Sequence, residues 1–121
     1  MATVNPTNTV LDLNAMAEID YESASQGDTI QFDYQAVGDE KLVILVDGAC
    51  TLTFNKGDSI QGVKNYDVTV ASAGAIRIDS GMFKNVDGTD ADGAVNGNKG
   101  YVVVTVKTAA AAVNVALIQL P

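Results

Sequence analysis

The sequence predicts an all-β protein: a compact antiparallel β-sandwich or small β-barrel with an extended N-terminal arm. Two observations support this fold class. Short runs between residues 26 and 120 alternate apolar and polar side chains, which is typical of strands with one buried face. Turn-forming Gly, Asp, Asn and Ser residues separate these runs at close spacing, and no long run has helical periodicity. The pattern predicts about seven or eight strands. A β-sandwich and a small β-barrel show this same alternation, so the alternation does not separate them.

The first half of the domain contains three of these strands. Residues 29–34 alternate cleanly and predict a half-buried strand. After a turn at 38–40, residues 41–46 are apolar on both faces, which indicates a central strand covered on both sides. The Asp-Gly dipeptide at 47–48 is a tight-turn signal. It predicts a hairpin between residues 41–46 and residues 50–54.

The second half continues the pattern. Further strands are expected at 66–70, 75–79, 101–107 and 113–120. Residues 59–64 fit either a short strand or a loop, and residues 85–100 form a long glycine-rich loop. Residues 109–112 are four alanines, which are too few to stand as a helix. We interpret them as a hairpin connection into the last strand.

The first 24 residues differ from the rest of the chain. They divide it into an N-terminal arm, 1–24, and a β-sandwich or barrel domain, 25–121. Neither the helical nor the strand period fits the arm. It is either a frayed terminus or a segment that becomes ordered against a partner. The candidate contact residues of the arm are its scattered apolar side chains and its proline: Val4, Pro6, Val10, Leu11, Leu13 and Met16.

Composition excludes several classes of function. The chain has 121 residues, one ordinary domain, and a formal net charge of -8. Phosphate binding needs clustered Lys and Arg, so nucleic acid is not an expected partner, and neither is an anionic membrane. The negative charge is explained either by solubility, because it keeps like molecules apart, or by a specific basic partner. The start of the chain has no signal-peptide pattern and no run is long enough to span a membrane, which predicts a soluble protein made in a cytoplasm.

Catalytic residues are scarce. The chain has no histidine, so Ser-His-Asp and Cys-His catalysis and the usual zinc sites are excluded. Its single cysteine, Cys50, lies in a strand-like run and is expected to be a buried, inert thiol. Arg77 is the only arginine, which excludes a phosphate clamp built on arginines. We therefore expect a protein that is not an enzyme and needs no cofactor.

One loop could hold a metal ion. Asp87, Asp90 and Asp92 lie close together between glycines, and calcium prefers several oxygen ligands from a flexible loop. The EF-hand pattern fails, however, because the positions that should supply further ligands after Asp90 are Ala94 and Tyr101. The alternative is an exposed, solvated Asp/Gly loop.

Four stretches of the chain together carry a resemblance to a known family: 41–46 leading into a glycine turn, 67–70 following 60–63, 80–85, and the closing run 113–121. With these stretches, residues 41–121 resemble small head proteins of tailed bacteriophages. The resemblance implies a head decoration, or cement, protein: a structural virion protein on the capsid exterior, made in the host cytoplasm. It also implies a homotrimer bound to the major capsid protein, and the arm residues named above would then contact the capsid.

A second hypothesis comes from a different class. The chain would be a ligand-recognition or adhesive β-sandwich module, such as a phage fibre or tail component. Its working surface would be the Asp/Gly-rich loop at 87–100, with or without calcium. The shortage of aromatic residues, which make up 6% of the chain and include no tryptophan, counts against sugar binding.

Overall fold

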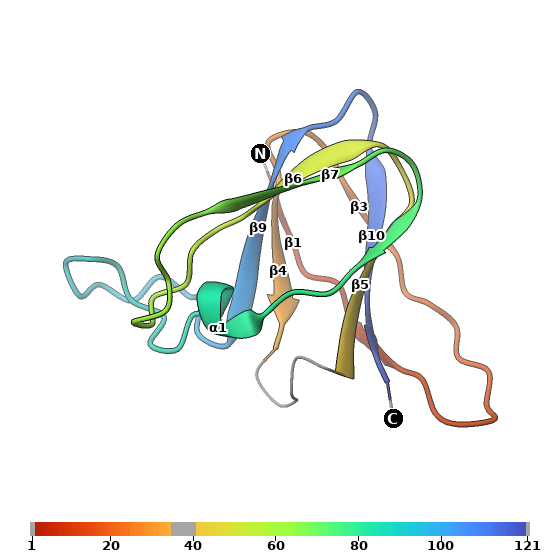
Figure 1. Ribbon diagram of the computed structural model, residues 1–121, viewed down its shortest axis with the longest axis horizontal. Coiled ribbons are helices and arrows are strands. Elements are labelled where there is room, and N and C mark those ends of the chain that lie inside the picture. The colour runs from red at the N-terminus through yellow and green to blue at the C-terminus, as the bar shows by residue number, and fades with distance from the viewer. Residues whose placement is uncertain (1, 35–40, 121) are drawn as a thin grey trace.

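Alternating apolar and polar residues produce two β-sheets that pack face to face in the computed structural model, which describes residues 2–34 and 41–120 (Figure 1). Sheet A has the strand order β1-β4-β9-β6-β7. Its strands are β1 (Thr3–Val4), β4 (Thr29–Asp33), β6 (Cys50–Phe54), β7 (Tyr66–Val70) and β9 (Tyr101–Thr108). Sheet B has the order β2-β10-β5-β8, with β3 also paired to β10. Its strands are β2 (Asn8–Val10), β3 (Glu22–Ala24), β5 (Leu42–Val46), β8 (Gly74–Ile76) and β10 (Val113–Gln119).

The β-sandwich prediction is confirmed. The two sheets do not close into a barrel over the described residues. Most neighbouring strands are antiparallel, but β1 pairs parallel to β4 and β2 pairs parallel to β10, so both sheets are mixed. The turn expected at 38–40 lies outside the described residues.

The core lies between the sheets and is built from every second residue of each long strand. The largest fully buried side chains are Tyr34, Phe32, Phe54, Ile30, Leu42, Ile44, Leu52 and Leu117. Phe54 packs against Phe83 with a distance of 5.7 Å between ring centroids. Phe83 belongs to α1 (Ser80–Phe83), a single helical turn whose N-cap, Asp79, accepts a hydrogen bond from Gly81 N at 2.9 Å. Residues 59–64 contain turns rather than a strand.

Both predicted hairpins are wrong. β5 pairs with β8 and β10 in sheet B, whereas β6 pairs with β7 and β9 in sheet A, so residues 47–49 cross between the sheets. The carboxylate of Asp47 accepts hydrogen bonds from the backbone and side chain of Asn114, which anchors this turn to β10. The connection at 109–112 crosses between the sheets in the same way, from β9 to β10.

Strand β5 is central in sheet B, but its outer side is only partly covered. Leu42, Ile44 and Val46 are buried in the core, whereas Val43 and Leu45 point to the opposite face and are half-buried. The continuous apolar run thus does not indicate a second covering layer here. It leaves apolar side chains on the outer face of the sheet.

The N-terminal segment is hydrogen-bonded into both sheets. β1 lies at the edge of sheet A, and β2 and β3 both pair with β10 of sheet B. Residues 2–10 therefore cross from one sheet to the other. Residues 11–21 form the exposed loop that joins β2 to β3 and extends from the right-hand side of the molecule in Figure 1.

Candidate functional site

The Asp/Gly loop is held by a single carboxylate from another part of the chain. Asp58 follows β6, and its side chain accepts four backbone hydrogen bonds from the start of the loop. The donors are the N–H groups of Val86 (2.6 Å), Asp87 (3.2 Å), Gly88 (2.7 Å) and Thr89 (3.4 Å). Asp58 therefore anchors the loop to the sandwich.

The ionised form of Asp58 is the one that these contacts stabilise. Partial burial of the carboxyl group acts to raise its pKa, but the N–H groups of Asp87, Gly88, Val86 and Thr89 outweigh burial, and the pKa lies below its ordinary value. No pattern in the sequence distinguishes Asp58, which lies in an ordinary Asn-Lys-Gly-Asp turn.

Close packing at Gly88 fixes the same part of the loop. Gly88 has a φ of 67°, in the left-handed region that favours glycine. A Cβ at this position would lie 2.7 Å from Cβ and 2.8 Å from the backbone nitrogen of Lys99. The two ends of the loop thus approach each other here, and only glycine fits.

The three predicted metal ligands are not brought together. Asp90 accepts a hydrogen bond from the side chain of Asn96 at 3.1 Å, and Asp92 accepts one from Ala94 N at 3.1 Å. Asp87 is exposed. Within residues 2–34 and 41–120, no three carboxylate or thiol side chains form a group that could hold a metal ion.

We expect calcium to leave the stability of this protein unchanged. The loop is already closed by Asp58 and by its own Asn and backbone groups, so a cation gains no ready ligand set. Melting curves should coincide in chelator and in calcium at about 1 mM, a concentration that stabilises proteins whose sites bind more tightly than that. A rise in melting temperature with calcium would contradict this expectation and restore the Asp87, Asp90 and Asp92 site.

A polar hollow of ≈ 500 Å³ lies between the Asp/Gly loop and the turn that follows β6. Its lining includes the side-chain amides of Asn55, Asn85, Asn96 and Asn98, together with the apolar Val103. Several of these amides already form hydrogen bonds within the protein. The side-chain oxygen of Asn98, for example, accepts a hydrogen bond from the side chain of Gln31 at 2.9 Å. The hollow offers polar groups to a small ligand, and none of the described residues that line it is aromatic.

The predicted contact residues of the N-terminal segment separate into two groups. Pro6 is buried and Val4 and Leu11 are half-buried, so these residues contribute to the fold. Val10, Leu13 and Met16 are exposed: 80% of the Leu13 surface and 82% of the Met16 surface is accessible to solvent. Of the predicted contact residues, only Val10, Leu13 and Met16 are therefore exposed enough to contact a partner.

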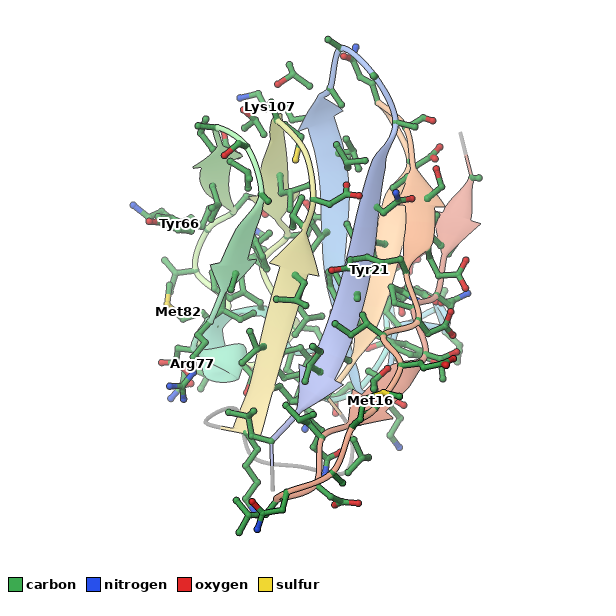
Figure 2. The ribbon with its side chains drawn as sticks, turned by 90° about the vertical axis from the view of Figure 1, so that its right-hand side faces the viewer. Met16, Tyr21, Tyr66, Arg77, Met82 and Lys107 are labelled. Carbon is green, nitrogen blue, oxygen red and sulfur yellow. The ribbon has the colours of Figure 1, made fainter. Side chains whose placement is uncertain are left out.

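Two further exposed residues extend this group. Ile19 and Tyr21, at 40% and 43% exposure, follow Met16 in the same loop, and Met16 and Tyr21 lie on the same side of the molecule in Figure 2. Ile19 was visible in the sequence only as one more scattered apolar residue. Tyr21 precedes a strand of three residues, too short to show an alternating pattern.

The single cysteine lies in the core. Cys50 is buried, and its burial, assisted by the negative charge of Asp47, raises the pKa of the thiol, as expected for an unreactive cysteine.

Among the described residues, no helix is long and apolar enough to cross a membrane.

Comparison with protein-family models, with curated proteins and with solved structures finds no match. The functional proposal therefore rests on the residues of this chain.

Proposed function

We propose that this chain is a structural virion protein that binds the outer surface of an assembled phage capsid and stabilises it by bridging capsid subunits. The observation that carries the proposal is the exposed apolar loop at 11–21. Leu13 and Met16 are each at least 80% exposed, and Val10, Ile19 and Tyr21 in or next to the same loop are exposed as well. Large apolar side chains exposed in this way mark protein-interaction surfaces when they lie together.

The sandwich presents this loop in a defined position. Both of its ends are tied to the same strand, since β2 pairs with Leu117–Gln119 and β3 pairs with Val113–Val115 of β10. A loop whose ends are already ordered loses less conformational entropy on binding than a free arm does. This geometry favours attachment to a large, preformed partner surface.

The remaining features agree with a mechanical role. The chain contains no histidine, and we propose that it is not an enzyme. Its partner would be the major capsid protein, with the decoration protein arranged as a homotrimer on the virion exterior. A protein that binds only the assembled shell stabilises that shell by linkage, because dissociation of subunits would first require its release.

Substitution of the loop tip tests the proposal. We expect the double variant Leu13→Ser and Met16→Ser to bind assembled capsids at least about tenfold more weakly than the wild type, as expected when anchor side chains of an interface are truncated. Its melting temperature should be unchanged, because both side chains are exposed. Capsids that lack the chain are mixed with each variant and sedimented, and the bound fraction is measured.

The matched control is Ile60→Ser with Val95→Ser, which removes two apolar side chains at 99% and 85% exposure from loops on another part of the chain. This control should bind as the wild type does. Equal binding of both double variants would contradict a role for the 11–21 loop.

The polar hollow supports one alternative function. A ligand-recognition or adhesive module, such as a fibre or tail component, would use the Asp/Gly-rich loop at 87–100, whose Asn96 and Asn98 line the hollow. Such a protein would be present in few copies or would bind the host surface rather than the shell. Copy number therefore separates the two functions.

A further inference from the structure

The outer faces of the two sheets differ in chemistry. The outer face of sheet A is polar and internally hydrogen-bonded. Thr53 donates to Asp67 at 2.7 Å, and Asp67 forms an ion pair with Lys107 at 2.8 Å. Thr51 and Thr69 face each other beside them, with their hydroxyl oxygens 3.4 Å apart. This face is suited to contact with water.

The outer face of sheet B is apolar across β8, β5 and residues 116–118 of β10, whereas Thr9, Ser23 and Asn114 lie on the same face toward its edge. Strand register places its members in two rows across β8, β5 and β10, since Ala75 pairs with Leu45, Leu45 with Ala116, and Val43 with Ile118. All five side chains lie outside the core cluster between the sheets. We call this surface the sheet-B outer face; it comprises Val43, Leu45, Ala75, Ala116 and Ile118, none of which has a polar group in its side chain.

Only part of this face is covered. Ala116 and Ile118, on β10, are buried, whereas Val43 and Leu45 on β5 are half-buried and Ala75 on β8 is exposed. The 11–21 loop lies on the outer side of β10 in both views, and Tyr21 lies in front of β10 in Figure 2. The β5 and β8 part of the face is therefore less covered than the β10 part.

We propose that the sheet-B outer face and the exposed apolar residues of the 11–21 loop form one protein-docking surface, and that its occupant is the capsid. This inference rests on the proposed function and adds to it the face of the sandwich that is turned toward the shell. A partly covered apolar sheet face and the exposed apolar residues of the loop beside β10 would together form a larger apolar surface than monomeric proteins usually expose.

Charge indicates the chemistry of the partner. The segment from residue 10 to residue 22 contains no Lys or Arg, and its carboxylates are Asp12, Glu18, Asp20 and Glu22. The basic residues closest in sequence to the sheet-B outer face are Lys41, before β5, and Arg77, after β8. The loop side of the patch is therefore acidic, and it fits a partner surface that has Lys or Arg beside an apolar strip.

The same charges argue against a second copy on this surface. A two-fold interface centred on the loop would bring one acidic loop against the other, and like charges brought together cost binding free energy. The homotrimer proposed above would use other parts of the chain, and this patch would remain free for the capsid.

Two variants with the same new side chain test the inference. Leu45→Lys places an ammonium group on the sheet-B outer face, and Thr69→Lys places one on the polar outer face of sheet A. We expect Leu45→Lys to weaken binding to assembled capsids at least about tenfold. Thr69→Lys should stay within about twofold of the wild type, since it changes the net charge equally but lies on the opposite face. The affinity of the wild-type protein for capsids should fall as the salt concentration is raised from about 0.05 to 0.5 M, because salt screens the attraction between the acidic loop and a basic partner surface.

Folding is checked by the melting temperature of each variant. If Leu45→Lys does not fold, Val43→Thr is used in its place, because threonine keeps the branched shape that suits a strand and adds only a hydroxyl group. It should weaken capsid binding by about threefold or more, the effect of about 0.7 kcal/mol.

Each outcome has a distinct meaning. Failure of the wild type to bind capsids overturns the proposed function and this inference together. Binding of the wild type with equal binding of Leu45→Lys overturns this inference alone. A change in oligomeric state of Leu45→Lys, measured by light scattering, assigns the face to a second copy and also overturns it. Weakened binding with an unchanged oligomeric state supports it.

Discussion

Replacing Asp58 with alanine is expected to lower the free energy of unfolding by about 2–3 kcal/mol, after allowance for partial exposure of the carboxylate to solvent. The substitution removes the one acceptor group shared by the backbone N–H groups of residues 86–89. It would release the Asp/Gly loop while leaving the two sheets intact. Urea unfolding followed by circular dichroism measures the change.

Asp92→Ala is the matched control, because it removes a carboxylate in the same loop that accepts a single backbone hydrogen bond. Its effect should stay below about 1 kcal/mol. Equal stability of the wild type and Asp58→Ala would show that the loop does not depend on this anchor.

Asp58 also predicts how stability varies with pH. Its folded-state pKa lies below the ordinary value of 3.8, so folding favours the ionised form. The resulting stabilisation is complete above the unfolded-state pKa of about 4 and is lost as the pH falls through the folded-state value. Between about pH 5 and pH 2.5, the wild type should therefore lose more stability than Asp58→Ala does. If the free energies of unfolding of the wild type and Asp58→Ala fell in parallel as the pH was lowered, the low pKa assigned to Asp58 would be contradicted.

Deletion of residues 2–11 is expected to destabilise the protein by about 3 kcal/mol. The deletion removes β1 and β2, including the hydrogen bonds from Thr29 N to Ala2 O and from Leu11 N to Gln119 O, and it removes the buried Pro6. It would also uncover the edges of β4 and β10, and unpaired strand edges promote aggregation. Urea unfolding and light scattering measure the two effects.

The comparison for this deletion is the double variant Leu13→Ser and Met16→Ser, which leaves both strands in place and should stay within about 0.5 kcal/mol of the wild type. A deletion variant as stable as the wild type would mean that residues 2–11 behave as a detachable arm. Truncation is therefore a poor test of capsid binding, because loss of affinity would follow from damage to the fold as well as from loss of contacts.

Strand positions could be predicted from the sequence because local alternation reports burial on one face. Residues 29–34, 66–70 and 101–107 have this pattern, and each forms a strand close to the expected bounds. Pairing between strands could not be predicted in the same way. The Asp-Gly turn at 47–48 carries the chain to the other sheet because Asp47 binds Asn114, a residue far away in the sequence.

The short N-terminal strands escaped prediction for a related reason. β1 and β2 have two and three residues, too few to show a period, and they are stabilised by the edges of β4 and β10 rather than by their own sequence. For the candidate site, the sequence offers Leu13 and Met16 as scattered apolar residues, whereas the exposure of Tyr21 and the half-buried outer face of β5 depend on tertiary structure.

A quantitative mass-spectrometric count of this chain in purified phage particles tests the central claim most directly. The proposed function predicts a copy number close to that of the major capsid protein, because every capsid site of one kind would be covered. A handful of copies would assign the chain to a fibre, vertex or tail, and absence from the particle would contradict a capsid role altogether.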